Sequence, residues 1–297
     1  IMSNSLTKES YYEGLTSYPA ARCVRILNPL SADLNVMRQT LLFNTMEAVQ
    51  LNANRRNGNL RLYEFGNCYF YDEAARDAEK PLSAYSEQYR LAIAVTGAAV
   101  PQSWNAKPQA SSFFTLRAVA EKLLRRFGLD IYALKCEPLQ SDLFGDGISL
   151  SAGNGRELLQ MGVVAPRIRR AFDLKQEVYY LEMNFDALVK STRKHRIAFE
   201  ELSKFPEVKR DLALLVDRQV TFAQLRAIAL ATERKLLKSV SLFDVYEGDK
   251  LPEGKKSYAL SFILEDKTRT LDERTIERVM ANLTRQFEQK CGAQVRA

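Results

Sequence analysis

In the last hundred residues, segments with strand-like spacing of hydrophobic residues are interspersed with segments with helix-like spacing. Apolar and polar side chains alternate along 212–216, 239–246 and 257–264, as in strands with one buried face. Hydrophobic residues at helical spacing mark about 221–238 and 272–290. The order strand, helix, strand, strand, helix, strand predicts a four-stranded antiparallel sheet with helices on one face. The other face of that sheet is open and can receive a ligand.

The first 195 residues carry the same two patterns in a longer arrangement. Helices are predicted from Ser31 or Asp33 to Asn57-Gly58, over 112–127 and over 167–172. Strands are predicted over 22–28, over 59–71 with a break at Gly66-Asn67, and over 89–97, 131–136, 148–152, 158–164 and 178–183. We therefore expect an α+β fold with a mostly antiparallel sheet.

The length of the chain and the distribution of its charged residues indicate how many domains it has and which partners it can bind. A chain of 297 residues can hold two cores, and the polar, charged stretch 190–204 predicts domains at 1–195 and 196–297. The net charge is +7, and the residues from Glu201 onward hold 18 basic against 15 acidic side chains, so the excess is spread evenly. This balance permits binding to a polyanion without establishing it, because a mixed solvated surface explains it equally well.

The sequence also predicts a compartment. No hydrophobic run reaches the roughly 18–20 residues that cross a bilayer, and no secretory signal pattern is present, so we expect a cytoplasmic protein without membrane contact. The four cysteines form no CxxC pair, which favours structural thiols in a reducing compartment. The chain begins Ile1-Met2-Ser3, which indicates a piece of a longer polypeptide.

The residue types that most catalytic sites require are scarce. His195 is the one histidine and lies in the charged stretch, so a zinc site or a nucleophile–histidine pair would have to use it. No GxxxxGK[ST] or GxGxxG loop is present. The acid pairs Asp142/Asp146 and Asp72/Glu73 lie in predicted loops, where solvated turn residues are common. We therefore predict no catalytic residue and no metal ligand.

Motifs in the first domain carry a resemblance. They are Asn28-Pro29-Leu30-Ser31, Met37-Arg38-Gln39-Thr40-Leu41-Leu42, Asn52-Ala53-Asn54-Arg55 and Leu62-Tyr63-Glu64-Phe65-Gly66. The domain resembles the class II aminoacyl-tRNA synthetase core as it occurs in the phenylalanyl-tRNA synthetase beta subunit family. In catalytic class II cores an Arg-x-Glu after such a glycine holds the ATP phosphate and the amino group. Aligned on Gly66, this chain has Phe70 and Asp72 there, and Phe70 cannot donate hydrogen bonds to a phosphate.

A second departure agrees with the first. The late class II arginine lies in a glycine-rich segment, and residues 161–166 stand in that region without repeated glycines or an arginine. The resemblance therefore implies an inactive scaffold that packs on a catalytic alpha subunit.

The second domain carries its own resemblance. Its motifs are Phe205-Pro206, Arg210-Asp211-Leu212-Ala213, Phe243-Asp244-Val245-Tyr246, Lys256-Ser257, Arg269-Thr270-Leu271 and Arg296. Together they resemble the ferredoxin-fold anticodon-binding domain of the same family. The resemblance implies a ferredoxin-like βαββαβ fold whose open face reads the first anticodon base, a guanine in tRNA(Phe).

Strand periodicity selects the side chains of that face. Asp244 and Tyr246 share a face because side chains alternate, and the core positions of the neighbouring strands turn Ala213 and Ser257 outward. A small residue leaves room, a ring stacks, and a carboxylate accepts hydrogen bonds from the guanine edge. The predicted anticodon site is Ala213, Asp244, Tyr246 and Ser257, with Arg210 and Arg296 at the anticodon backbone. Taken singly, each has an ordinary structural reading: a strand-end ring, a turn partner or a small edge residue.

These resemblances imply one function. The chain is predicted to be part of the beta subunit of phenylalanine–tRNA ligase, which binds tRNA(Phe) and scaffolds the alpha subunit of an alpha2beta2 heterotetramer. The full enzyme would use ATP and Mg2+, and this fragment would bind neither. Two alternatives stay open: a free-standing RNA-binding or assembly module with the same folds, and an enzyme with an unrecognised site in the first domain.

Overall fold

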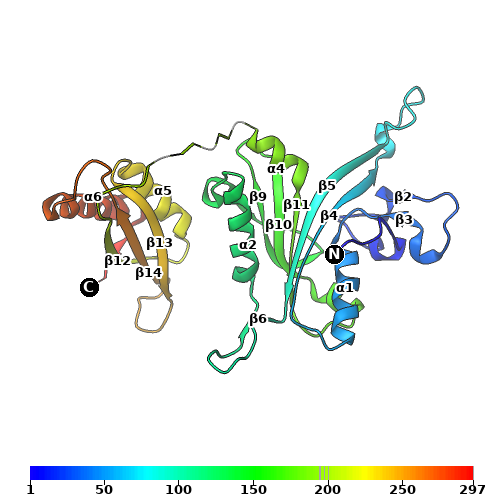
Figure 1. The fold of residues 1–297 in the computed structure, drawn as a ribbon, viewed down its shortest axis with the longest axis horizontal. Coiled ribbons are helices and arrows are strands. Elements are labelled where there is room, and N and C mark those ends of the chain that lie inside the picture. The colour runs from blue at the N-terminus through cyan, green and yellow to red at the C-terminus, as the bar shows by residue number, and fades with distance from the viewer. Residues whose placement is uncertain (194, 197, 200, 297) are drawn as a thin grey trace. The chain divides into compact units, whose positions relative to one another are not determined.

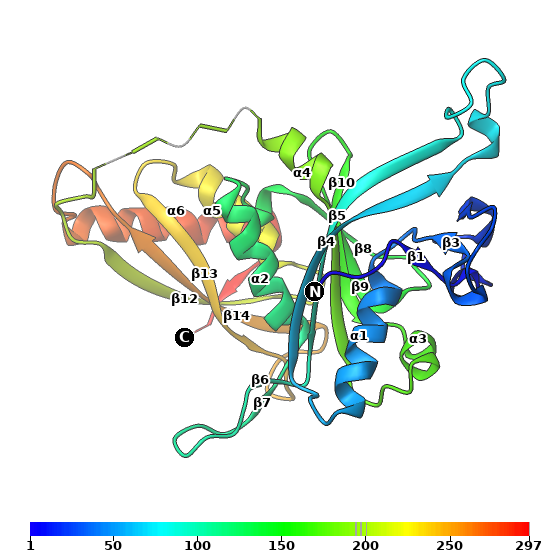
Figure 2. The same ribbon diagram turned by 45° about the vertical axis from the view of Figure 1, so that its right-hand side comes forward.

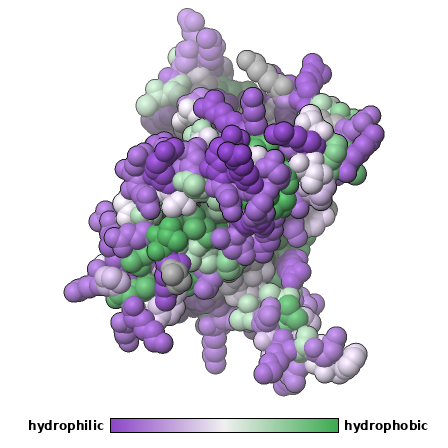
Figure 3. All heavy atoms as spheres, turned by 90° about the vertical axis from the view of Figure 1, so that its left-hand side faces the viewer, coloured by the Kyte–Doolittle hydropathy of each residue, from purple (hydrophilic) through white to green (hydrophobic). Residues whose placement is uncertain are grey.

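The computed structural model describes residues 1–193, 195, 196, 198, 199 and 201–296. The chain forms two compact units, Ile1–Ile197 and Ala198–Ala297 (Figure 1). Each unit combines helices with antiparallel sheets, so the predicted α+β class is confirmed. In the view of Figure 3 most side chains at the surface are hydrophilic, and hydrophobic ones are visible in several smaller areas between them. Within the described residues no helix combines the length and the apolar character that a membrane span needs.

A six-stranded antiparallel sheet forms the centre of the first unit. Its order is β4 (Leu60–Tyr71), β5 (Tyr85–Thr96), β11 (Val178–Asn184), β10 (Glu157–Val164), β9 (Phe144–Ser151) and β8 (Lys135–Pro138). The predicted break at Gly66-Asn67 is wrong, because both residues keep their pairing with β5. Any larger residue at position 66 would collide with the buried Arg38 side chain, since a Cβ there would lie 2.0 Å from Arg38 Nη2.

Helices cover both faces of this sheet (Figure 2). The helices α1 (Leu42–Asn54) and α3 (Pro166–Ala171) pack on one face, and α2 (Phe113–Arg126) and α4 (Phe185–Thr192) pack on the other. The predicted helix over 112–127 is confirmed: Ser112 and Thr115 form a capping box at its start, and Gly128 follows its end with a positive φ. The sheet is therefore buried on both sides by separate cores.

The first predicted helix begins later than expected. Residues 31–41 instead contain the 3-10 turn η3 (Ala32–Leu34) and the short strand β3 (Val36–Met37). This strand pairs with β1 (Leu6–Thr7) and β2 (Val24–Arg25). Helical spacing was present at 34–49, but these long-range strand partners determine the local structure of its first part.

Short elements complete the first unit. They are the strands β6 (Ala98–Val100) and β7 (Gln109–Ala110) and the 3-10 turns η1 (Glu9–Tyr12), η2 (Ala20–Arg22), η4 (Glu73–Ala75) and η5 (Ile131–Ala133). The turn η5 takes the place of the first half of the strand predicted over 131–136. The hairpins that join β4 to β5 and β6 to β7 project from the unit (Figures 1 and 2).

The second unit has the predicted element order. It consists of β12 (Val208–Asp217), α5 (Phe222–Thr232), β13 (Leu237–Tyr246), β14 (Lys255–Leu264), α6 (Glu273–Cys291) and β15 (Gln294–Val295). The sheet order is β13-β14-β12-β15, with every neighbouring pair antiparallel. Helix α5 is shorter than predicted, because the Glu233 carboxylate accepts the N–H groups of Lys235 and Leu236 and turns the chain into β13.

One hydrophobic core holds the second unit together. Helices α5 and α6 lie on the same side of the sheet (Figures 1 and 2). Even-numbered residues of β12 and β14 face them, among them the fully buried Leu214, Val216, Leu260 and Phe262. We call the opposite side of this sheet the open face, because none of the unit's described helices covers it.

Candidate nucleic-acid interface

Small side chains form the floor of the open face. Ala213 of β12 lies opposite Ala259 of β14, and Ser257 lies opposite Leu215. Their chain neighbours Leu214 and Tyr258 are buried in the core, so alternation turns these small residues to the open face. The resulting floor leaves room for a planar group above the strands.

A β-bulge in β13 places two of the predicted site residues on this face. Val240 and Leu242 pair with Phe262 and Leu260 and therefore belong to the core side. The register shifts by one residue between Leu242 and Asp244, so Asp244 lies opposite Ala259 and Tyr246 opposite Ser257. Without this extra residue, even-numbered Asp244 and Tyr246 would point into the core.

Tyr246 is held at the edge of the open face by two contacts. A Cβ added to Gly248 would lie 2.6 Å from the Tyr246 hydroxyl, so the ring packs directly on this glycine. The Arg296 guanidinium carbon lies 5.4 Å from the centre of the ring, a cation–π distance. The Arg296 N–H donates to the Ala213 carbonyl at 2.9 Å, so Arg296 is fixed beside the floor of the same face.

Asp244 and Ser257 differ in accessibility. Asp244 is exposed, and its carboxylate has no hydrogen-bond or ion-pair partner within the described part of the chain, so it is not a turn partner. Ser257 is 5 % exposed, because Tyr246 and Leu215 flank it on the neighbouring strands. Asp244 therefore offers a free acceptor, whereas Ser257 belongs to the floor rather than to the outer surface.

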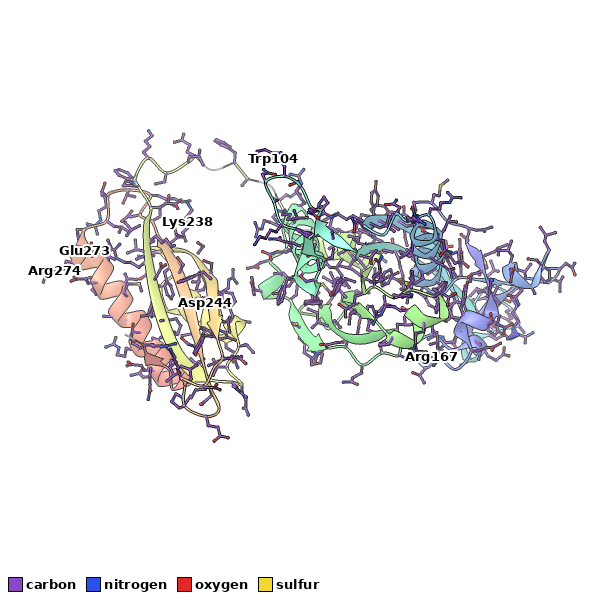
Figure 4. The ribbon with its side chains drawn as sticks, turned by 90° about the horizontal axis from the view of Figure 1, so that it is seen from below. Trp104, Arg167, Lys238, Asp244, Glu273 and Arg274 are labelled. Atoms are coloured by element: carbon purple, nitrogen blue, oxygen red, sulfur yellow. The ribbon has the colours of Figure 1, made fainter. Side chains whose placement is uncertain are left out.

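The structure separates Arg210 from the other predicted residues, which corrects its assignment. Arg210 lies opposite Phe262 and thus on the helix side of the sheet. Its Nη2 donates to both carboxylate oxygens of Glu273, at 2.7 and 2.8 Å, in the first turn of α6. Figure 4 shows Glu273 at α6 and Asp244 over the strands of the same unit. Arg210 therefore fastens α6 to β12.

Phe243 also lies at the open face, although it is not one of the predicted site residues. It is the extra residue of the bulge and is 58 % exposed, and Lys209 Nζ lies 5.8 Å from the centre of its ring. A signal was present in the sequence. Residues 240, 242, 244 and 246 would all lie on one face of an uninterrupted strand. A core position for the first two and an open position for the last two therefore require a bulge between them.

Two family models match the chain. The first, described as the phenylalanyl tRNA synthetase beta chain CLM domain, matches residues 1–185, and the second, a ferredoxin-fold anticodon binding domain, matches residues 203–296. The chain belongs to the phenylalanyl-tRNA synthetase beta chain family. The family resemblance and the ferredoxin fold predicted from the motifs are confirmed.

Curated relatives carry a consistent name, phenylalanine–tRNA ligase beta subunit. The protein from Bacteroides fragilis is 47 % identical over 296 residues, which are 100 % of this chain and 36 % of that protein. The one from Porphyromonas gingivalis is 43 % identical over the same shares, and the one from Syntrophotalea carbinolica is 31 % identical over 94 % of this chain and 34 % of its own. The chain thus spans about a third of the length of these proteins.

The solved structures to which this chain is similar include a pyrrolysyl-tRNA synthetase from Desulfitobacterium hafniense. It is 13 % identical, with a TM-score of 0.46, and the alignment covers 64 % of this chain and 62 % of that one.

The positions that the resemblance aligns with ATP-binding residues have structural contacts in the first unit. Phe70 is buried against the core, and the Asp72 carboxylate accepts the Ala74 N–H at the start of η4. Residues 161–166 form the end of β10 and the start of α3. Within the described residues no group of three or more Cys, His, Asp and Glu side chains is placed to hold a metal ion.

The other titratable candidates of the first unit have structural contacts. His195 is exposed and its ring packs on Gly128. Burial alone would raise the pKa of Asp142, but hydrogen bonds from Ser17 and Thr16 outweigh it and hold that pKa below its usual value. Burial raises the pKa of the Cys68 thiol, which keeps it protonated and unreactive.

Proposed function

We propose that this chain is a tRNA-binding, non-catalytic part of a phenylalanine–tRNA ligase beta subunit. The second unit would bind the anticodon of tRNA(Phe) on its open face, through Ala213, Asp244, Tyr246, Ser257 and Arg296. The match to an anticodon-binding domain and the free Asp244 carboxylate beside the Tyr246 ring support this proposal. A carboxylate accepts from the N1–H and N2–H2 groups of guanine, and a ring provides a stacking plane.

The first unit has a different proposed role. We infer that residues 1–195 form a class II-like scaffold without catalysis, which packs against the alpha subunit of an alpha2beta2 enzyme in the cytoplasm. The name of the curated relatives supports a partner subunit, and the misfit of Phe70 and Asp72 to ATP supports placing the chemistry elsewhere. ATP and Mg2+ would then bind to the complete enzyme outside this chain.

The central test is the substitution Asp244→Ala. We expect it to weaken the binding of transcribed tRNA(Phe) to the 297-residue chain by about 1–3 kcal/mol, because the guanine edge loses its acceptor. Discrimination between guanine and adenine at the first anticodon position should fall with it. The measurement is filter binding or fluorescence anisotropy at one fixed salt concentration, because phosphate contacts make affinity salt-dependent.

Glu277→Ala provides the matched control for this test. Glu277 is exposed on α6, on the helix side of the sheet, and its loss changes the net charge by the same amount. Wild-type affinity in the control together with a loss in Asp244→Ala supports a site on the open face. Equal affinity of all three proteins would contradict the proposed site.

The absence of catalysis has its own test. We expect the 297-residue chain to give no pyrophosphate exchange with phenylalanine and ATP, because Phe70 occupies the position of the ATP-binding arginine. Addition of the alpha subunit and the remainder of the beta subunit should restore exchange. Turnover by the chain alone would show that the first unit is an active ligase core.

A further inference from the structure

A polar cavity of about 270 Å³ lies within the first unit, on the α1 side of its sheet. The strands β4, β5 and β10 contribute Phe70, Gln88 and Gln160, and the N-terminal segment contributes Arg22 and Gln39. Serine and glutamine side chains make up much of the remaining lining. The anticodon site does not involve this cavity, and no part of the proposed function uses it.

One wall of the cavity is cationic. The guanidinium carbons of Arg22 and Arg90 lie 5.8 and 5.2 Å from the centre of the Phe70 ring, so one ring orients both groups. Arg90 forms an ion pair with Glu182 and is therefore neutralised. Arg22 is exposed and has no carboxylate partner among the residues that the structure describes. The cavity thus keeps one positive charge available for a ligand.

A negative charge on the cavity lining is also available. The Glu157 carboxylate accepts from the Gln160 amide at 2.9 and 3.0 Å and, within the described chain, pairs with no cation. Arg22 and Glu157 line the same cavity without forming an ion pair with each other. A ligand that carries both a carboxylate and an ammonium group can compensate both side chains at once.

A buried acceptor gives an independent reason to expect a ligand. Gln39 lines the cavity and is 1 % exposed. Its Nε2 donates to the Pro19 carbonyl and to Cys23 Sγ, both at 3.1 Å, while its Oε1 has no hydrogen-bond partner within the described residues. An unsatisfied buried acceptor is costly, and a rotation of the Gln39 side chain that brings Oε1 to the cavity surface would let a ligand N–H or O–H group relieve that cost.

We propose that this cavity binds a small α-amino acid with a polar side chain. Arg22 holds the carboxylate, Glu157 holds the ammonium group, and the glutamine and serine side chains hydrogen-bond the polar side chain. Phenylalanine is excluded as the preferred ligand, because both aromatic rings of the cavity lining, Phe70 and Tyr18, already contact guanidinium groups. The site is therefore distinct in ligand class from a phenylalanine-activating pocket.

The test is a titration of the 297-residue chain by calorimetry and ligand-observed NMR. The probes are L-glutamine, L-serine, L-phenylalanine, glutaramic acid (glutamine without its amino group) and inorganic phosphate. We expect saturable binding of glutamine or serine, weaker binding of phenylalanine and glutaramic acid, and no saturable binding of phosphate. Arg22→Gln and Glu157→Gln should each weaken the polar amino acid about tenfold, as expected for one charge-assisted hydrogen bond.

Arg76→Gln on the β4–β5 hairpin is the matched control and should bind as the wild type does. Arg22 and Glu157 are both exposed, so the variants should fold, which an unchanged unfolding midpoint verifies. Three results would overturn the proposal: no saturable binding at about 10 mM, a concentration well above a Kd of 1 mM; equal binding of glutamine and glutaramic acid; or phosphate binding that depends on Arg22 alone. None of these results bears on tRNA binding by the second unit.

Discussion

Substitution of Glu64→Ala is expected to lower the free energy of unfolding of the first unit by about 3–5 kcal/mol, because it leaves one member of a buried ion pair without its partner. Glu64 and Arg38 are 1 % and 3 % exposed, and Arg38 Nη1 lies 2.9 Å from Glu64 Oε1. The Ser3 hydroxyl donates to the same carboxylate at 2.7 Å. The substitution therefore leaves the buried Arg38 cation without its counter-charge and the Ser3 hydroxyl without its acceptor.

Calorimetry of the 297-residue chain measures this effect. For a unit of this size 1 kcal/mol corresponds to about 2–4 °C, so the transition of the first unit should fall by roughly 6–20 °C. The transition of the second unit should not move. Glu73→Ala is the control, because its ion pair with Arg76 is exposed and such pairs add little stability. Equal shifts in the two variants would contradict the importance of burial.

Substitution of Tyr246→Ala is expected to weaken tRNA(Phe) binding by about 1–3 kcal/mol, or roughly 5–150-fold, because a stacked base loses its aromatic partner. The ring is fixed before any ligand arrives, since it packs on Gly248 and lies beside the Arg296 guanidinium. A pre-positioned ring loses little conformational entropy on binding, which favours the upper part of this range.

Two variants identify the cause of the loss. Tyr246→Phe keeps the stacking plane and removes the hydroxyl, so it should retain most of the affinity. Tyr63→Ala removes an exposed tyrosine from β4 of the first unit and should leave binding unchanged. If Tyr246→Phe binds as weakly as Tyr246→Ala, the hydroxyl rather than stacking is responsible, and the proposed role of the ring is wrong.

Alternation of hydrophobic residues predicted the second unit well because its strands have a single buried face. The core positions of β12 and β14 follow from their even-numbered apolar residues, and the open position of Ala213 follows from them. In β13 the same rule is insufficient. Val240 and Asp244 have the same parity in the sequence, yet they face opposite sides, because a bulge intervenes. That Asp244 and Tyr246 share a face could be predicted; that the shared face is the open one depends on pairing with β14.

Contacts far apart in the sequence explain the remaining differences. The start of α1 was misplaced because Val36 and Met37 pair with strands from residues 6–7 and 24–25. Arg210 was assigned to the anticodon because it is a cation beside a recognised motif, but its partner Glu273 lies 63 residues away. A motif identifies the residues that accompany a fold, whereas only the pairing register shows on which side of the sheet each one lies.

Because of the bulge at Phe243, the proposed anticodon site depends on the number of residues in β13 as well as on their identity. Deleting this one position would return β13 to plain alternation, and the carboxylate and ring of Asp244 and Tyr246 would turn toward the helices. The side chain at the bulged position is exposed, whereas the number of residues between Leu242 and Asp244 sets the register. Single-residue deletions in β13 should therefore be tolerated less well than any substitution at Phe243.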